Sequence, residues 1–175
     1  VAVLEKSRDY GAHILSGAVL DPSALTELVP DWRERGAPLE LPVRDDRVYF
    51  FTRGGKIRFP FTPPPLRNHG NYVVSLNRFV KWMAEQAEAE GIDVFTGFPG
   101  VELLYDQNRV VGVRTGDRGL DRDGHRKPTF EPGVDIHARV TILADGVRGN
   151  LTKALIRRFS LDEGRIPQVY AVGIK

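Results

Sequence analysis

The stretch VAVLEK, residues 1–6, limits the possible folds of this chain more than any other feature. Four apolar residues run directly into Glu5, without the alternation of a strand that is exposed on one face. Continuous apolar runs of this kind are typical of strands in parallel sheets, which helices cover on both faces. We therefore expect a buried strand over residues 1–4, in an α/β fold, with a carboxylate at its carboxyl end.

A carboxylate in this place has a known use in dinucleotide-binding βαβ units. The second strand of such a unit ends in an acidic residue that accepts hydrogen bonds from ribose hydroxyls. Glu5 fits this role, and Lys6 beside it is a second candidate for cofactor binding. The first strand and its G-x-G-x-x-G turn would then lie about 20 or more residues upstream. An ordinary strand that ends in a solvated glutamate is the alternative interpretation.

Two further stretches are candidates for the same kind of ligand. Ser16-Gly17-Ala18 predicts a tight turn, and small residues let a backbone approach a planar ring closely. The stretch TILADGVRGN, residues 141–150, predicts a buried strand, then Asp145-Gly146, then the start of a helix. Free N–H groups at a helix start favour a polar or anionic ligand, and Asp145 would accept from a sugar-like hydroxyl. A plain turn and a simple helix cap are the alternatives.

The rest of the sequence predicts short helices and strands in mixed order. Apolar spacing and capping residues predict three helices: one beginning at Asp21-Pro22, one over residues 77–90 with Asn77 as its N-cap, and one over residues 149–159. Turn residues predict two hairpins, over residues 48–61 and 101–116. The pattern also predicts an exposed strand over residues 134–139, a buried strand over 140–143 and a last strand over 169–175.

Composition excludes several classes of site. The chain has no cysteine, which excludes disulfides and thiolate-bound metal or iron–sulfur sites within this sequence. Its net charge is +2, and no basic block alternates with aromatic residues, so no nucleic-acid partner is expected. No apolar run reaches the ~18 residues that would span a bilayer. Asp121-x-Asp123-Gly124 begins like a calcium loop but lacks the later glutamate, so we expect a hairpin turn and no metal site.

Taken in order, these elements resemble the FAD-binding, Rossmann-like fold of the glutathione-reductase type, with a β-meander before Asp145-Gly146. Longer strings are similar to one family, the electron transfer flavoprotein–ubiquinone oxidoreductases. They are EKSRDYGAHILSGAVLDPSALTELVPDW, NHGNYVVSLNRFVKWMAEQAEAEGIDVFTGF and ADGVRGNLTKALIRRF. The resemblance extends over essentially all 175 residues.

The resemblance implies an enzyme that carries FAD, takes electrons from reduced electron transfer flavoprotein and delivers them to ubiquinone. By position, Glu5 would hold the FAD ribose with Lys6 next to it, Ser16 and Gly17 would lie near the flavin ring, and Asp145 and Gly146 would lie on the ribityl–pyrophosphate side. The resemblance implies no catalytic side chain in this chain. It also implies a [4Fe–4S] cluster whose cysteines lie downstream, and a monotopic place on the inner membrane, on its matrix or cytoplasmic face.

The resemblance further implies how the chain is divided. Residues 1–36 would belong to the FAD-binding domain and include a membrane-facing segment at 10–31, residues 37–70 to a quinone-binding subdomain, and residues 71–175 to the FAD-binding domain again. The loop 59–66 would be a second membrane-facing segment. The sequence would then be an excerpt, truncated at both ends, that is not expected to be active alone.

Two other functions stay open. One is a related FAD-dependent reductase or monooxygenase that needs no iron–sulfur cluster. The other is a membrane-surface or protein-binding module that keeps an FAD-type scaffold without its chemistry.

Overall fold

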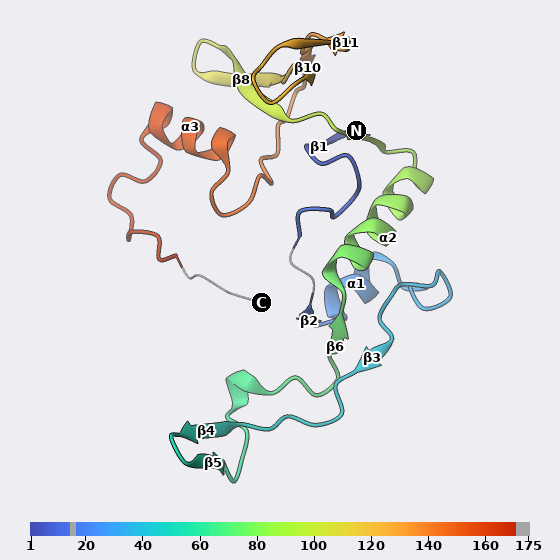
Figure 1. Cartoon of the computed structure of the whole chain (residues 1–175), viewed down its shortest axis with the longest axis vertical. Coiled ribbons are helices and arrows are strands. Elements are labelled where there is room, and N and C mark those ends of the chain that lie inside the picture. Colours follow the sequence, from blue (N-terminus) through green and yellow to red (C-terminus); the bar gives the residue numbers. More distant parts are fainter. Residues whose placement is uncertain (15–16, 171–175) are drawn as a thin grey trace. The chain divides into compact units, whose positions relative to one another are not determined.

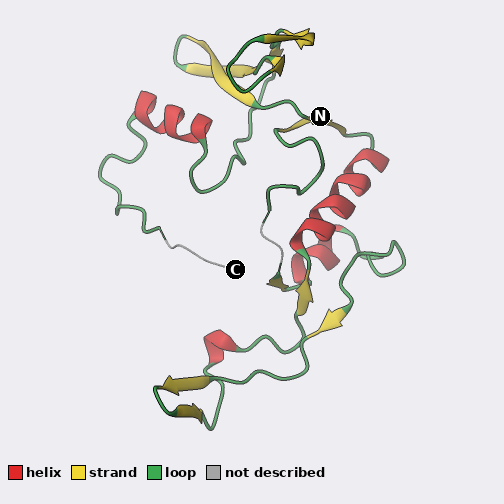
Figure 2. Ribbon diagram, in the orientation of Figure 1, coloured by secondary structure: helices red, strands yellow, loops and turns green. Residues whose placement is uncertain are grey.

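The computed structural model describes residues 1–14 and 17–170 (Figures 1 and 2). It divides into two compact units. The first unit comprises Val1–Asp9 and the chain from Ile92 onward, and the second comprises Tyr10–Gly91. Both units contain helices and strands, so the mixed α/β character is confirmed. The assignment of residues 1–36, 37–70 and 71–175 to FAD-binding and quinone-binding parts stays a prediction.

The first unit contains the predicted parallel strand. Strand β1 (Ala2–Glu5) pairs in parallel with β7 (Asp93–Thr96), and Glu5 lies opposite Thr96. The expected burial on both faces is wrong, because Val3 is 43% exposed. Among the described residues β7 is the one strand that pairs with β1, and a sheet this narrow offers little area for helices to cover.

An antiparallel meander is the widest described sheet of the first unit. Its strands are β8 (Gly100–Asp106), β9 (Arg109–Thr115) and β12 (Asp135–His137), with β9 in the centre. The turn between β8 and β9 has Gln107 at a φ of 52°, which confirms the predicted hairpin. A second hairpin, of β10 (Arg118–Leu120) and β11 (Arg126–Glu131), precedes β12 and turns at the Asp121–Gly124 stretch as expected.

The predicted buried strand over residues 140–143 is wrong. These residues form no ladder, and Val140 and Ile142 are 75% and 86% exposed. No described strand accepts their backbone hydrogen bonds, and an extended segment becomes a sheet strand only when a neighbour does so. The predicted helix follows as α3 (Asn150–Phe159). The last predicted strand, 169–175, falls mostly outside the described residues, and its first two residues are not in a strand.

The second unit is built around two tryptophans. Its antiparallel sheet has the order β2 (Ala18–Leu20), β6 (Tyr72–Val74), β3 (Leu41–Pro42), and its helices are α1 (Ser23–Leu28) and α2 (Leu76–Ala89). The buried core consists of Leu25, Trp32, Leu39, Val74 and Trp82. Both indole N–H groups have acceptors at 3.0 Å, Thr26 Oγ1 for Trp32 and the Arg35 carbonyl for Trp82. Buried tryptophans are stabilised by such partners.

The helix starts differ from the prediction by one or two residues, since Pro22 and not Asp21 precedes α1, and Ser75 and not Asn77 precedes α2. Helix α2 begins at Leu76, so Asn77 lies inside it, and the Asn77 side chain donates to the Gly11 carbonyl at 2.7 Å instead of capping the helix. Helix α1 begins at Ser23, whose N–H donates to Asp21 Oδ1 at 2.9 Å. Gly91 ends α2 at a φ of 79°, as a residue in the left-handed region commonly does.

Residues 43–70 form an excursion of the second unit, which we call the arm. It contains the predicted hairpin of β4 (Tyr49–Thr52) and β5 (Gly55–Arg58), followed by a short 3₁₀ helix, η1 (Pro64–Leu66). Two side chains hold its ends together: the Asp46 carboxylate accepts from the Asn68 backbone N–H at 2.8 Å and from Asn68 Nδ2 at 3.2 Å. The arm therefore has a fixed base although its strands pair only with each other.

The meander depends on close backbone contact at Gly112. A Cβ at this position would lie 2.1 Å from the Ile136 carbonyl oxygen. We therefore expect Gly112→Ala to push β9 and β12 apart and to lower the stability of the first unit by about 1–3 kcal/mol. Hydrogen exchange of the β12 amides measures this loss. Gly54→Ala is the matched control, because nothing lies within 4 Å of its added methyl group. Equal protection in both variants would contradict the expectation.

Candidate functional site

Glu5 is the last residue of β1, and Ser7 contacts one of its two carboxylate oxygens. Glu5 Oε1 accepts from the Ser7 N–H at 2.7 Å and lies 2.8 Å from Ser7 Oγ. Ser7 is buried, and its hydroxyl also lies 2.6 Å from the Asp9 carbonyl. Within the described residues, Glu5 Oε2 has no hydrogen bond, so this oxygen is the one that can accept from a ligand.

The chain after β1 runs beside the chain after β7. The Phe98 N–H donates to the Glu5 carbonyl at 3.0 Å, and the Gly97 N–H donates to the Ser7 carbonyl at 2.7 Å. The carboxyl ends of both parallel strands therefore meet at one edge, the place where open α/β sheets bind ligands. Glu5 lies at this edge, and Lys6 next to it is exposed.

Asp145 is bonded to the start of α3. Its Oδ2 accepts from the N–H groups of Leu151 and Thr152 at 2.9 and 3.1 Å, and its Oδ1 accepts from the Thr152 hydroxyl. Partial burial raises the pKa of Asp145, but the hydrogen bonds from Thr152 and Leu151 outweigh it, so the pKa is lowered overall. The carboxylate is thus ionised at neutral pH and occupied by the helix. These contacts match the helix-cap alternative.

Two glycines give Asp145 this position. Gly146 has a φ of 80°, which turns the chain sharply, and its carbonyl accepts from the Gly149 N–H at 3.0 Å. A Cβ on Gly149 would lie 2.0 Å from the Asp145 carboxyl carbon. The loop therefore brings the carboxylate back onto α3, and Asp145 already holds two of the N–H groups that were expected to attract an anionic ligand.

The first unit brings Glu5 and Asp145 to the same small core. Leu4, which precedes Glu5, and Leu143, just before Asp145, both pack against the cluster of Leu103, Val113 and Leu151. Gly17 belongs to the second unit and has a φ of 92°. Ser16 lies outside the described residues. The structure thus connects two of the predicted site segments through one core.

The sequence reasoning missed two residues of this site. Ser7 was missed because its role depends on the turn that follows β1, although a serine two residues after a strand-ending acid is the available signal. Gly149 was missed because it supports a side chain four residues earlier. Thr141 Oγ1 is a further candidate: it is buried and has no hydrogen-bond partner within the part of the chain that the structure describes.

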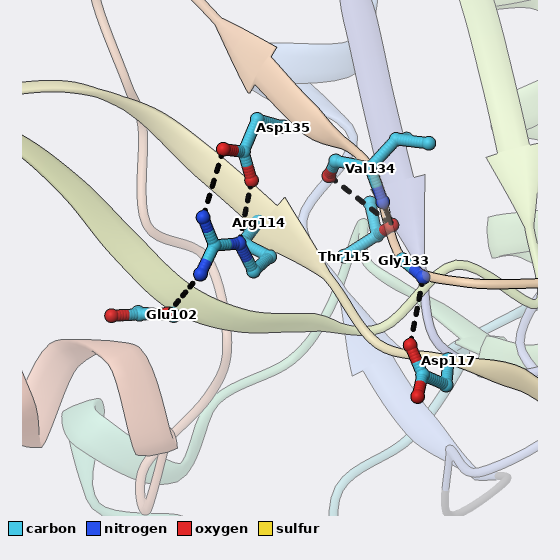
Figure 3. Close-up of polar contacts among 7 residues, drawn as sticks. All are labelled: Glu102, Arg114, Thr115, Asp117, Gly133, Val134 and Asp135. Carbon is cyan, nitrogen blue, oxygen red and sulfur yellow. Dashed lines mark hydrogen bonds and ion pairs between the residues drawn. The ribbon is translucent and has the colours of Figure 1, made fainter.

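A charged cluster stabilises the meander of the first unit (Figure 3). The Arg114 guanidinium contacts Asp135 through two bonds of 2.6 and 2.9 Å and Glu102 through one of 3.1 Å, so it joins β9 to both neighbouring strands. These bonds lower the pKa of Asp135 and raise the pKa of Arg114. Asp117 accepts from the Gly133 N–H at 2.8 Å near the same strands. Every charged side chain of the cluster has a hydrogen-bond partner within it, so we assign it a structural role.

The contacts of Asp145 lead to a test of its role. Asp145→Asn keeps the shape of the side chain but removes the charge, and we expect it to weaken the first turn of α3 by about 1 kcal/mol. Hydrogen exchange at the Leu151 and Thr152 amides would then be about fivefold faster at neutral pH. Asp123→Asn, on an exposed turn, is the control.

The same contacts predict a pH dependence. The folded pKa of Asp145 lies below its unfolded value of about 3.9. The carboxylate therefore stabilises the fold above that value, and its contribution is lost as the pH falls through the folded pKa. Asp145→Asn should abolish this part of the acid dependence. An unchanged acid profile at the α3 amides would contradict the assignment.

Comparison with known proteins gives the chain a clear set of relatives. No protein-family model matches it. Two solved structures share its fold. The first is a myxobacterial chondrochloren halogenase, described as an FAD-dependent halogenase, with a TM-score of 0.55 and 22% sequence identity; the match covers 88% of this chain and 33% of that chain. The second is a geranylgeranyl bacteriochlorophyll reductase-like protein of Thermoplasma acidophilum, with a TM-score of 0.54 and 16% sequence identity; the match covers 86% of this chain and 34% of that chain. They confirm the predicted FAD-binding fold.

Closer relatives share the sequence itself. The chain is 48% identical over its whole length to the mitochondrial electron transfer flavoprotein–ubiquinone oxidoreductases of Bos taurus and Homo sapiens, and 45% identical to a probable electron transfer flavoprotein–ubiquinone oxidoreductase of Acinetobacter baylyi. The chain spans 29% of the length of the two mitochondrial proteins and 31% of the length of the Acinetobacter protein. The resemblance predicted from the sequence strings is thereby confirmed: from end to end, the chain is homologous to about three-tenths of an electron transfer flavoprotein–ubiquinone oxidoreductase.

Proposed function

We propose that the chain provides FAD-binding and membrane-facing parts of an enzyme that passes electrons from reduced electron transfer flavoprotein to ubiquinone at a membrane surface. The observation that carries this proposal is the identity of 45–48% over the whole chain to proteins of that name. Identity at this level over the whole of this chain, which covers 29–31% of those relatives, supports a shared activity more strongly than a shared fold does.

The edge at β1 and β7 fits the adenosine end of FAD. Glu5 Oε2 would accept from a ribose hydroxyl, while Ser7 fixes the other oxygen and so the direction of the carboxylate. Lys6, next to it, is a second candidate for this end. When bound, FAD would supply the ring that carries electrons, and the chain would hold and orient it.

The other proposed contacts come from the remaining predicted site residues. Ser16 and Gly17 would lie near the flavin ring, and Gly146 would lie near the ribityl–pyrophosphate side. Asp145 would act there indirectly, since its carboxylate positions the start of α3. The chain has no cysteine, so its residues do not fit a [4Fe–4S] cluster, and cluster ligands would have to come from elsewhere in the protein.

We further propose that the protein lies on the inner membrane, on its matrix or cytoplasmic face. Two relatives are named as mitochondrial. Within the described residues, no helix has the length and apolar character needed to cross a membrane. The arm instead exposes large apolar side chains, namely Phe50, Phe51, Ile57, Phe59, Phe61 and Leu66. These side chains and segment 10–31 would contact the lipid interface where ubiquinone is taken up.

A related FAD-dependent reductase or monooxygenase is the second candidate. The two solved structures that share the fold, an FAD-dependent halogenase and a reductase-like protein, support it. The visible spectrum of the intact protein distinguishes the candidates. Flavin bands with a broad iron–sulfur absorbance, and quinone reduction by reduced electron transfer flavoprotein, support the first. Flavin bands alone, without that activity, support the second, and a colourless protein supports a module that has kept only the scaffold.

The Glu5 contact is testable in the intact protein. We expect Glu5→Ala to weaken FAD binding about 10- to 100-fold, because hydrogen bonds to a charged group contribute roughly 1.5–3 kcal/mol before desolvation offsets part of it. Flavin release on dilution, followed by fluorescence, measures the change. Glu27→Ala, on the exposed side of α1, is the control. Unchanged flavin affinity in Glu5→Ala would remove Glu5 from the site.

The membrane contact has a separate test. Phe51→Glu with Phe61→Glu should release the intact protein from vesicles and slow the reduction of a long-tailed quinone more than that of a soluble acceptor dye. Phe51→Leu with Phe61→Leu keeps the apolar surface and should stay bound. If both activities fell equally in a yellow, folded double-Glu variant, the membrane role of these residues would be refuted.

A further inference from the structure

We infer that the arm, residues 43–70, recognises a membrane surface rich in anionic phospholipid headgroups. This inference rests on the proposed membrane contact and adds the charge of the lipid. The arm carries six arginine or lysine residues and two aspartates, a formal charge of +4, whereas the whole chain carries +2. The cations are Arg44, Arg47, Arg53, Lys56, Arg58 and Arg67. Positive charge is thus concentrated on the segment that also exposes the most aromatic surface.

The pairing of β4 with β5 sorts these side chains onto two faces. Phe50 lies opposite Ile57, which makes one face apolar. Phe51 lies opposite Lys56, and Tyr49 opposite Arg58, so the other face mixes aromatic rings with cations.

The mixed face suits the boundary between lipid tails and headgroups. Lys56 Nζ lies 5.1 Å from the centre of the Tyr49 ring, so a cation and an aromatic ring occupy the same place on this face. Aromatic side chains beside lysine and arginine are typical of segments that lie in a membrane interface.

The cations of the arm are mostly uncompensated. Asp45 pairs with Arg47, which is the one ion pair within the arm among the described contacts. Asp46 accepts from Asn68 and so belongs to the base of the arm. Arg53, at the hairpin turn, and Lys56 have no acidic partner within the described residues, and Arg58 forms no ion pair there. These charges remain available for headgroups, and each would strengthen binding to an anionic surface about fivefold.

The exposed rings argue for a bilayer as the occupant. Phe51 is 73% exposed and Phe61 is 63% exposed, and no described segment covers either of them. A lone two-stranded hairpin is marginally stable in water. A surface that is apolar inside and negatively charged outside complements both the rings and the cations.

The experiment compares binding of the full chain to vesicles of phosphatidylcholine alone and to an equimolar mixture with phosphatidylglycerol, at low and at high salt. We expect tighter binding to the mixed vesicles and weakening by salt, since exposed charges are screened. Lys56→Gln with Arg58→Gln should lose about 25-fold in affinity for the mixed vesicles. Its affinity for phosphatidylcholine should stay unchanged.

Two controls separate charge from damage to the hairpin. Arg122→Gln with Lys127→Gln removes the same charges from the exposed β10–β11 hairpin and should change binding less than about twofold. Lys56→Arg with Arg58→Lys exchanges the cations and should bind like the parent chain. If the exchanged variant also loses binding, the hairpin's shape and not its charge is responsible, and the inference is overturned.

The remaining outcomes are decisive as well. Equal binding to both kinds of vesicle, insensitive to salt, overturns the anionic preference but leaves the proposed membrane contact intact. No binding to either kind overturns both, whereas the flavin spectrum and electron-transfer assay judge the enzyme activity independently. Salt-sensitive binding to heparin, without preference for the mixed vesicles, would indicate an acidic macromolecule as the partner and would also overturn the inference.

Discussion

The parallel pairing of β1 with β7 is the constraint on which the first unit depends. It joins residues 1–9 to the chain beyond Ile92, and the whole second unit forms the connection between the two strands. Parallel strands always need a long connection, because the chain must return to the same end of the sheet. Here the connection holds its own core around Trp32 and Trp82, so it is more than a crossover. The pairing also sets Glu5 at the sheet edge.

Four carboxylates show how the chain uses its negative charges. Asp135 is neutralised by Arg114, Asp46 closes the arm, and Asp145 caps α3. Each of these is bonded on both oxygens by groups of the chain itself. Glu5 differs, since Ser7 holds one oxygen and leaves the other without a partner in the described structure. The three aspartates use both carboxylate oxygens to support the fold, whereas Glu5 has one oxygen that can accept a hydrogen bond from a ligand.

Local chemistry made much of the fold predictable. The Arg53-Gly54 turn, the polar turn at Gln107 and the glycine after α2 each fix a backbone conformation from a few neighbouring residues. The failures involve distant partners. Asn77 has the right side chain for a cap, but Gly11 offers it a carbonyl from 66 residues away. Residues 140–143 have the composition of a buried strand, yet no described strand pairs with them, and no local pattern reveals that.

Local sequence signals and distant contacts also contribute differently to the candidate site. Glu5 and Asp145 were found because acids at strand ends and before helices leave a local signature, and the contacts then show that Asp145 caps α3 while one oxygen of Glu5 has no partner among the described residues.

The positive charge of the arm could be counted from the sequence. Its proposed role in membrane binding depends on the strand register, which places Lys56 beside Tyr49. Outside the arm, the 175-residue chain has 19 basic and 21 acidic residues, so it carries −2 while the arm carries +4. Such an asymmetry orients a protein before contact, because the field of an anionic surface attracts one segment and repels the rest. Under the proposed function, meeting the membrane in one orientation would favour the delivery of electrons to a lipid-soluble acceptor.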